Sequence, residues 1–200
     1  MTTDTPKNLL TPEFRVSFPF VFRPQKPMNE GGTPKYSVVM LFPKGEKLTA
    51  LKNAVKELLV EKLGADSQKW PKNLTLPFKD QGDKTMAGYE AGAVSITATS
   101  KVRPGLVNSA NEDIIDEVEF YSGCYAHATV RPFFYEVKGE NGGVMKRGVS
   151  FGLQNIQKKR DGEPLSGRMK AQDEFEPVAG AGTSEASVAV GSGGAMDLLN

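Results

Sequence analysis

The fold of this chain is decided by the stretch EVEFYSGCYAHATVRPFFYEVKGENGGVMKRGVSFGLQNIQK, which runs from Glu117 to Lys158. It predicts two long strands joined by a turn at the glycine-rich GENGG. The stretch is rich in aromatic residues: Phe120, Tyr121, Tyr125, Phe133, Phe134, Tyr135 and Phe151. Because successive side chains of a strand point to opposite faces, the first strand can be divided into two faces by parity.

The two faces of this first strand differ in chemistry. One face is small or apolar and suits a core: Cys124, Ala126, Ala128, Val130 and Phe134. The other mixes rings with cationic and hydrogen-bonding groups: Tyr125, His127, Thr129, Arg131, Phe133 and Tyr135. Aromatic rings interleaved with arginine favour stacking on nucleobases beside a phosphate backbone. The alternative is that both faces are buried in a sandwich or barrel.

Composition describes a chain with a real core and an uneven charge. Apolar residues make up 38% and charged residues 24% of the 200 residues, and no run of about 18 apolar residues predicts a membrane span. A secretory signal is not expected at the N-terminus, and the single cysteine, Cys124, fits a reducing compartment. All 25 Lys and Arg fall within residues 1–170 with 19 of the 24 acids, a net charge of +6 that permits a polyanionic ligand.

Alternating apolar residues predict further strands. Residues 14–22 place Phe14, Val16, Phe18, Phe20 and Phe22 on one face, which predicts a core strand. Pro19 lacks a donor, so this strand is expected to be at an edge or bulged there. Strands are also predicted at residues 35–42 and 94–99, and in the second half of the hairpin, where Val149, Phe151 and Leu153 share a face.

The chain has one clear helical pattern. Apolar residues at helical spacing predict a helix over residues 46–63, ended by Gly64. With five or six strands, this predicts a mostly β single domain over residues 1–170, and a small barrel of the oligonucleotide-binding (OB) type with long loops is favoured. An immunoglobulin-like sandwich is the alternative. Residues 171–200 are rich in Gly, Ala, Ser and acids, which predicts a disordered acidic tail.

Catalytic and cofactor motifs are weak. With one histidine, His127, a His-paired zinc site is excluded and a catalytic triad is hard to assemble. The acids between residues 112 and 119 could hold Mg²⁺ for a nuclease, but a solvated strand start explains them better. We therefore expect a protein that is not an enzyme and uses no metal or cofactor.

The motifs SGCYAHATVRPFFYE, VSFGLQNIQ, DGEPL and RPGLVN resemble those of a known family. This is the family of tailed-bacteriophage single-stranded-DNA-binding proteins of the phage Enc34 type, first catalogued as a domain of unknown function. The likeness covers residues 8–170. It implies an OB fold, sequence-tolerant binding of single strands in phage DNA replication or recombination, no enzymatic activity, and location in the cytoplasm of the infected host. It also implies that the acidic tail competes with DNA and recruits replication or recombination proteins.

The residues and the resemblance together predict a site. Bases are expected to stack on Tyr125, Phe133, Tyr135 and, from a loop, Tyr89. Phosphates and polar groups are expected to contact Arg131, His127, Lys101, Arg103, Lys79 and Lys84, with Lys146 and Arg147 in reserve. For Phe133, Tyr125 and Tyr135 a core position is the alternative. Weak duplex binding is expected when the tail is absent. A structural virion β-domain that binds protein is the other function left open.

Overall fold

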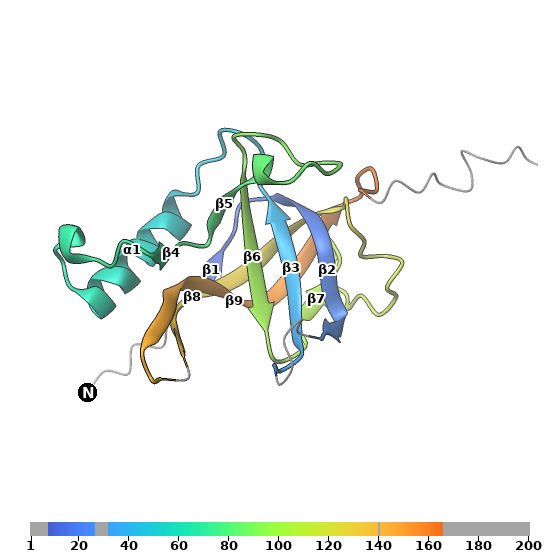
Figure 1. The fold of residues 1–200 in the computed structure, drawn as a ribbon. Helices are drawn as coiled ribbons and strands as arrows, with labels where there is room; N and C mark the ends of the chain where they lie inside the picture. The colour runs from blue at the N-terminus through green and yellow to red at the C-terminus, as the bar shows by residue number, and fades with distance from the viewer. Residues whose placement is uncertain (1–7, 27–31, 140, 166–200) are drawn as a thin grey trace, which may run out of the picture. The chain divides into compact units, whose positions relative to one another are not determined.

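The computed structural model describes residues 8–26, 32–139 and 141–165, and its centre is a closed ring of strands (Figure 1). The ring is formed by β2 (Phe14–Gln25), β3 (Lys35–Leu41), β6 (Val94–Ser100), β9 (Val144–Arg160) and β8 (Tyr125–Lys138), which pairs again with β2. All pairs in the ring are antiparallel except β6–β9, which is parallel. This order is that of an OB barrel and confirms the prediction, whereas a sandwich would need two separate sheets.

Short elements extend the ring at its edges. The strands are β1 (Leu9–Leu10), β4 (Leu74–Thr75), β5 (Phe78–Asp80) and β7 (Gly105–Val107), and two single turns of 3₁₀-helix lie at Ser67–Lys69 and Gln81–Asp83. β1 pairs with β8, and β5 pairs with β6. β4 and β7 pair with the same edge of β9 as β6 does. Along this edge β9 therefore pairs in turn with β4, β6 and β7.

The barrel interior is filled by the apolar faces that alternation predicts. The central side chains are fully buried: Phe14, Val16, Val38, Met40, Ile96, Ala98, Ala126, Val130 and Phe151. Val149, Phe151 and Leu153 share the inner face of β9 as predicted, and Cys124 lies in the core just before β8. Burial raises the pKa of the Cys124 thiol to about 11, because the thiolate would lose its hydration there.

The alternation predicted for residues 14–22 is wrong after Val16. Phe18 has a positive φ of 44° and is 39% exposed, and the register with β3 shifts between Ser17 and Phe20. Val21, which the alternation places outside, is buried instead. The bulge lies next to Pro19, whose missing N–H cannot continue the ladder, so the strand changes face at that point.

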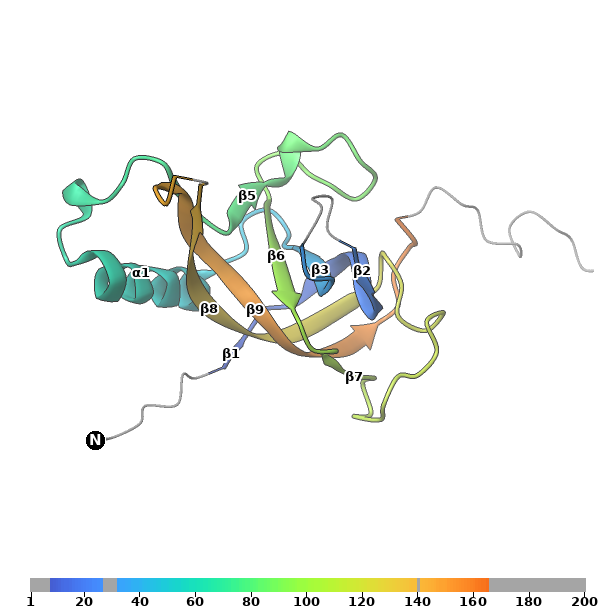
Figure 2. The ribbon, with the colours of Figure 1, turned by 60° about the horizontal axis from the view of Figure 1, so that its bottom comes forward.

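The single α-helix, α1 (Thr49–Leu63), lies beside the β8–β9 hairpin (Figure 2). It buries Leu51, Val55 and Leu59 and ends at Gly64, whose φ of 91° suits glycine. It begins three residues later than predicted, because Leu48 is used as the buried residue that precedes the first turn. In the described part of the chain, no helix is long and apolar enough to cross a membrane. The predicted tail, residues 171–200, lies outside the described residues.

Candidate nucleic-acid interface

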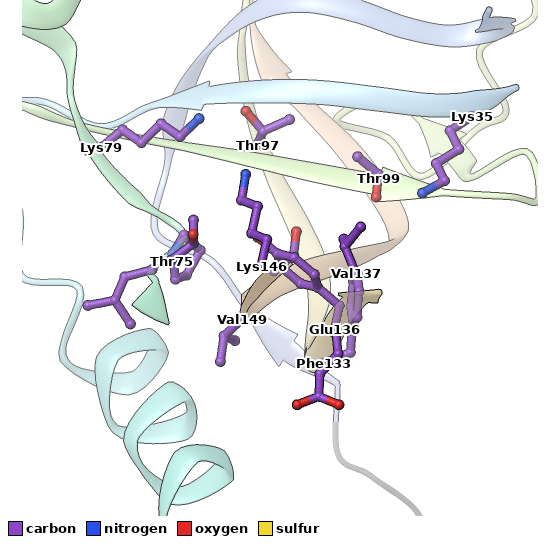
Figure 3. Close-up of a pocket in the computed structure, with 14 residues that line it drawn as sticks. Lys35, Thr75, Lys79, Thr97, Thr99, Phe133, Glu136, Val137, Lys146 and Val149 are labelled. Atoms are coloured by element: carbon purple, nitrogen blue, oxygen red, sulfur yellow. The ribbon is translucent and has the colours of Figure 1, made fainter. Parts of the chain in front are cut away.

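A groove of about 500 Å³ lies between the outer face of β6 and the arm formed by β8 and β9 (Figure 3). The arm exists because β8 and β9 continue pairing from Tyr125 to Lys138, well beyond the point at which β9 leaves β6. The lining of the groove comes from six strands and one connection: Lys35, Thr75, Leu76, Pro77, Lys79, Thr97, Thr99, Phe133, Tyr135, Glu136, Val137, Lys146, Val149 and Ser150.

The barrel side of the groove is small and polar. Thr97 and Thr99 point outward from β6, because Ile96 and Ala98 between them point into the core. They lie opposite Val39 and Ser37 of β3 in the antiparallel register. This side of the groove therefore offers hydroxyl groups on short side chains, so that a flexible chain can lie close to the sheet.

The arm contributes two aromatic rings. Phe133 is 39% exposed, so it is a surface ring, and it lies opposite Ser150 on β9. Tyr135 lies opposite Gly148, a position where a Cβ would come within 2.3 Å of the Thr75 carbonyl oxygen, so glycine is required for β4 to pair there. Phe133 and Tyr135 are two residues apart and share the face of β8 that lines the groove.

Three lysines reach the groove from three different elements (Figure 3). Lys35 begins β3, Lys79 lies on β5 and Lys146 lies on β9. Among the described residues, none of the three has a hydrogen bond or an ion pair to an acid. The groove thus combines unneutralised positive charge with one exposed and one half-buried ring. This is the chemistry of a site for a polyanion that carries flat bases.

Two of the predicted residues form a separate cluster on the loop after β5. The Tyr89 hydroxyl is 3.1 Å from Ser17 Oγ, and Lys84 Nζ lies 5.6 Å from the centre of the Tyr89 ring. The same ammonium group lies 5.5 Å from the ring of Phe18. Asp80 closes this loop by accepting hydrogen bonds from the amides of Gly82 and Gly92, which lower the pKa of its carboxyl group.

Other predicted side chains are occupied inside the protein. The guanidinium of Arg160 lies 3.5 Å from the centre of the Tyr125 ring and bonds to Glu13, so Tyr125 stands in a different hollow. His127 Nδ1 is 2.9 Å from the Thr11 carbonyl oxygen, and Arg131 donates to the side chain of Asn8. These contacts fix the segment around β1 to β8.

The remaining predicted cations lie outside the groove. Arg147 pairs with Glu136 at 3.7 Å. Lys101 and Arg103 are exposed in the connection after β6, where the guanidinium of Arg103 lies 5.7 Å from the ring of Phe22. The structure thus brings together only four of the predicted residues: Phe133, Tyr135, Lys79 and Lys146.

Sequence reasoning missed Lys35, Thr97 and Thr99. The two threonines could have been found from the sequence, since they alternate with apolar residues in a predicted strand and so lie on its outer, polar face. Lys35 had none, because its place depends on the pairing of β3 with β6.

The acids between residues 112 and 119 do not converge. Glu112 accepts from the Asn108 amide, the Asp116 carboxylate accepts from the Val118 N–H, and Glu117 pairs with Arg23 at 3.1 Å. Among the described residues, no three His, Cys, Asp or Glu side chains are placed to hold a metal ion. A nuclease site at this cluster is therefore not supported.

Comparison with known proteins agrees with this geometry. Residues 7–187 match the model of a family described as the single-stranded-DNA-binding protein of Enterobacter phage Enc34. Protein p50 of Acyrthosiphon pisum secondary endosymbiont phage 1 is 29% identical over 174 residues, which cover 82% of this chain and 90% of that protein.

Solved structures give the same result. The single-stranded DNA-binding protein from bacteriophage Enc34, in complex with ssDNA, matches with a TM-score of 0.60 and 25% identity, over 79% of this chain and 89% of that one. The gp2.5 single-stranded DNA binding protein of bacteriophage T7 shares the fold, with a TM-score of 0.54 and 14% identity over 82% of this chain and 97% of that one. The OB barrel, the groove and the match over most of its length show that this chain belongs to the family of the Enterobacter phage Enc34 single-stranded-DNA-binding protein.

Proposed function

We propose that this protein binds single-stranded DNA without sequence preference, in the groove between β6 and the β8–β9 arm. The observation that carries the proposal is the groove itself, where the exposed ring of Phe133, the half-buried ring of Tyr135 and three lysines without acidic partners surround a hydroxyl-lined floor. Family membership supports it, because the family is described by a phage protein that binds single-stranded DNA.

The proposed mechanism has two parts. Bases stack on Phe133 and Tyr135, and each such stack contributes roughly 1–3 kcal/mol whatever the base. Phosphates lie near Lys35, Lys79 and Lys146, and their neutralisation releases counterions. A duplex hides the faces of its bases, so only a single strand can use both parts.

This activity fits a role in phage DNA replication or recombination in the cytoplasm of the infected host, where single strands need protection. It requires no cofactor and no catalysis. Contacts of the predicted tail with replication or recombination proteins are part of the proposal and rest on its sequence alone. Tyr125, His127 and Arg131 hold internal contacts, so we assign them to the framework beside the site.

A gel-shift assay tests the proposal. A labelled oligothymidine should shift with the full-length protein, and an excess of unlabelled duplex should compete poorly. The double variant Phe133→Ala/Tyr135→Ala should weaken the shift while keeping the melting temperature close to that of the wild type. No shift, with a folded protein, would refute DNA binding and favour a virion β-domain that binds protein.

A further inference from the structure

Two apolar side chains are exposed on the connection between β7 and β8. Ile115 is 83% exposed and Val118 is 80% exposed, whereas Ile114 and Phe120 are each only 2% exposed. The connection is therefore anchored by the buried Ile114 and Phe120, and between them it presents Ile115 and Val118 to the outside. We call residues 108–120 the acidic loop.

The acidic loop has a fixed shape. The Ile114 amide donates to the Leu106 carbonyl oxygen at 2.9 Å, and the Asp116 carboxylate accepts from the Val118 N–H at 2.8 Å. Asn108 Oδ1 accepts from the amides of Ala110 and Glu112. Because these bonds already order the loop, a partner that covers Ile115 and Val118 would not have to order it, and such preorganisation favours binding.

The charge of this loop is opposite to that of another part of the same chain. The acidic loop contains acids and no Lys or Arg: Glu112, Asp113, Asp116, Glu117 and Glu119. Residues 44–79, which we call the basic end, include α1 and β4 and carry twice as many lysines as acids. The lysines are Lys44, Lys47, Lys52, Lys56, Lys62, Lys69, Lys72 and Lys79, and the acids are Glu46, Glu57, Glu61 and Asp66.

These two parts lie at opposite ends of the barrel. In Figure 1 and in Figure 2, α1 lies at one side of the barrel and the connection between β7 and β8 lies at the other. The basic end also exposes an apolar side chain outside the groove, since Val60 is 37% exposed. Each copy of the chain therefore carries two complementary surfaces, each with at least one exposed apolar side chain, that cannot meet within one molecule.

We infer that neighbouring copies of this protein contact one another head to tail on single-stranded DNA, with the acidic loop of one copy against the basic end of the next. Such a contact joins two different surfaces, so it can repeat along a strand without closing into a ring. The groove reaches the basic end, because Thr75 and Leu76 belong to its lining.

This inference rests on the proposed function. The exposed apolar area is small, so the contact is weak between free molecules. Copies bound side by side on one strand have a high effective concentration, and the contact then forms. The result is cooperative binding to long DNA by a protein that is a monomer when free.

Measuring cooperativity distinguishes the contact between neighbouring copies from DNA binding itself. Affinity is measured for an oligothymidine of about one site, roughly 10 nucleotides, and for poly-dT. Ile115→Ser/Val118→Ser should bind the short oligomer like the wild type and lose affinity and steepness on poly-dT. A loss between about 5-fold and 150-fold is the range of typical coupling between sites. Val102→Ser is the matched control, because Val102 is 75% exposed on another connection.

A charge swap makes the test sharper. Asp113→Lys/Glu119→Lys and Lys52→Glu/Lys56→Glu change side chains without hydrogen bonds or ion pairs to other described residues. Each pair alone should reduce cooperativity, and all four changes in one chain should restore it. Non-cooperative wild-type binding, unchanged binding by the loop variants, or no restoration would overturn the inference. Failure of the wild type to bind the short oligomer would instead refute the proposed function.

Discussion

Replacing one groove lysine should change the salt dependence of DNA binding by a predictable amount. Lys35, Lys79 and Lys146 come from three elements and line one groove, and in the described residues none is neutralised by an acid. For single strands, the slope of log K against log salt is about −0.7 for each neutralised phosphate. The three lysines together should therefore contribute about −2 to the slope.

The size of the effect follows from this slope. Between 50 and 200 mM salt, three phosphate contacts account for a loss of affinity of about 18-fold, and one contact for about 2.6-fold. Lys79→Gln should therefore make the slope shallower by about 0.7, and the triple Gln variant by about 2. Fluorescence titrations of an oligothymidine at four or more salt concentrations measure these slopes.

Lys62→Gln is the control for these titrations. Lys62 is at the end of α1 and pairs with Glu61 at 2.8 Å, so its replacement should leave the slope unchanged. Equal slopes for the wild type and the triple variant would show that phosphates do not lie in the groove. Equal losses for Lys62→Gln and Lys79→Gln would show that only the net charge of the protein matters.

Three further predictions concern the rings, the tail and the buried thiol. Phe133→Ala should weaken oligothymidine binding by about 5-fold to 150-fold, the equivalent of one stack, in a fluorescence titration, and Tyr125→Ala should change it little; the reverse order would place the bases elsewhere. Removing residues 171–200 should tighten DNA binding, most at low salt, because the tail carries five acids; equal affinities would contradict this. The pKa of the Cys124 thiol is raised from 9.0 to about 11 in the folded protein, so the unfolded chain loses the thiol proton at a lower pH than the folded protein does. The free energy of unfolding should therefore be unaffected by this thiol below pH 9 and should fall by about 1.4 kcal/mol per pH unit between pH 9 and pH 11. Urea unfolding of the wild type and of Cys124→Ala at several pH values measures this fall. Equal pH dependence of the unfolding free energy in the two proteins would refute the prediction.

Much of the barrel could be predicted from alternation alone. Ala126, Ala128 and Val130 on β8, and Phe151 and Leu153 on β9, are buried as their parity indicates. Period-2 alternation is a local signal, so it survives without knowledge of the strand's neighbours. It fails at Phe18, because a bulge changes the parity and the sequence indicates only that Pro19 disturbs the ladder.

The site was harder to predict than the fold. Tyr125, His127, Arg131 and Phe133 share one parity, yet the chain meets different neighbours along β8. The N-terminal segment contacts His127 and Arg131, and Arg160 covers Tyr125. Only beyond these contacts does the strand enter the arm, where Phe133 is open to the groove. These neighbours are more than 30 residues away in the chain, so parity cannot distinguish an open ring from an occupied one.

Photocrosslinking tests the central claim most directly. An oligothymidine that contains one 5-iodouracil is bound to the full-length protein, irradiated and digested, and the crosslinked residue is identified by mass spectrometry. Crosslinks at Phe133 or Tyr135 are the predicted result, because a base that stacks on these rings places its reactive carbon against them. Crosslinks confined to Tyr125 and its surroundings, with none in the groove, would contradict the account.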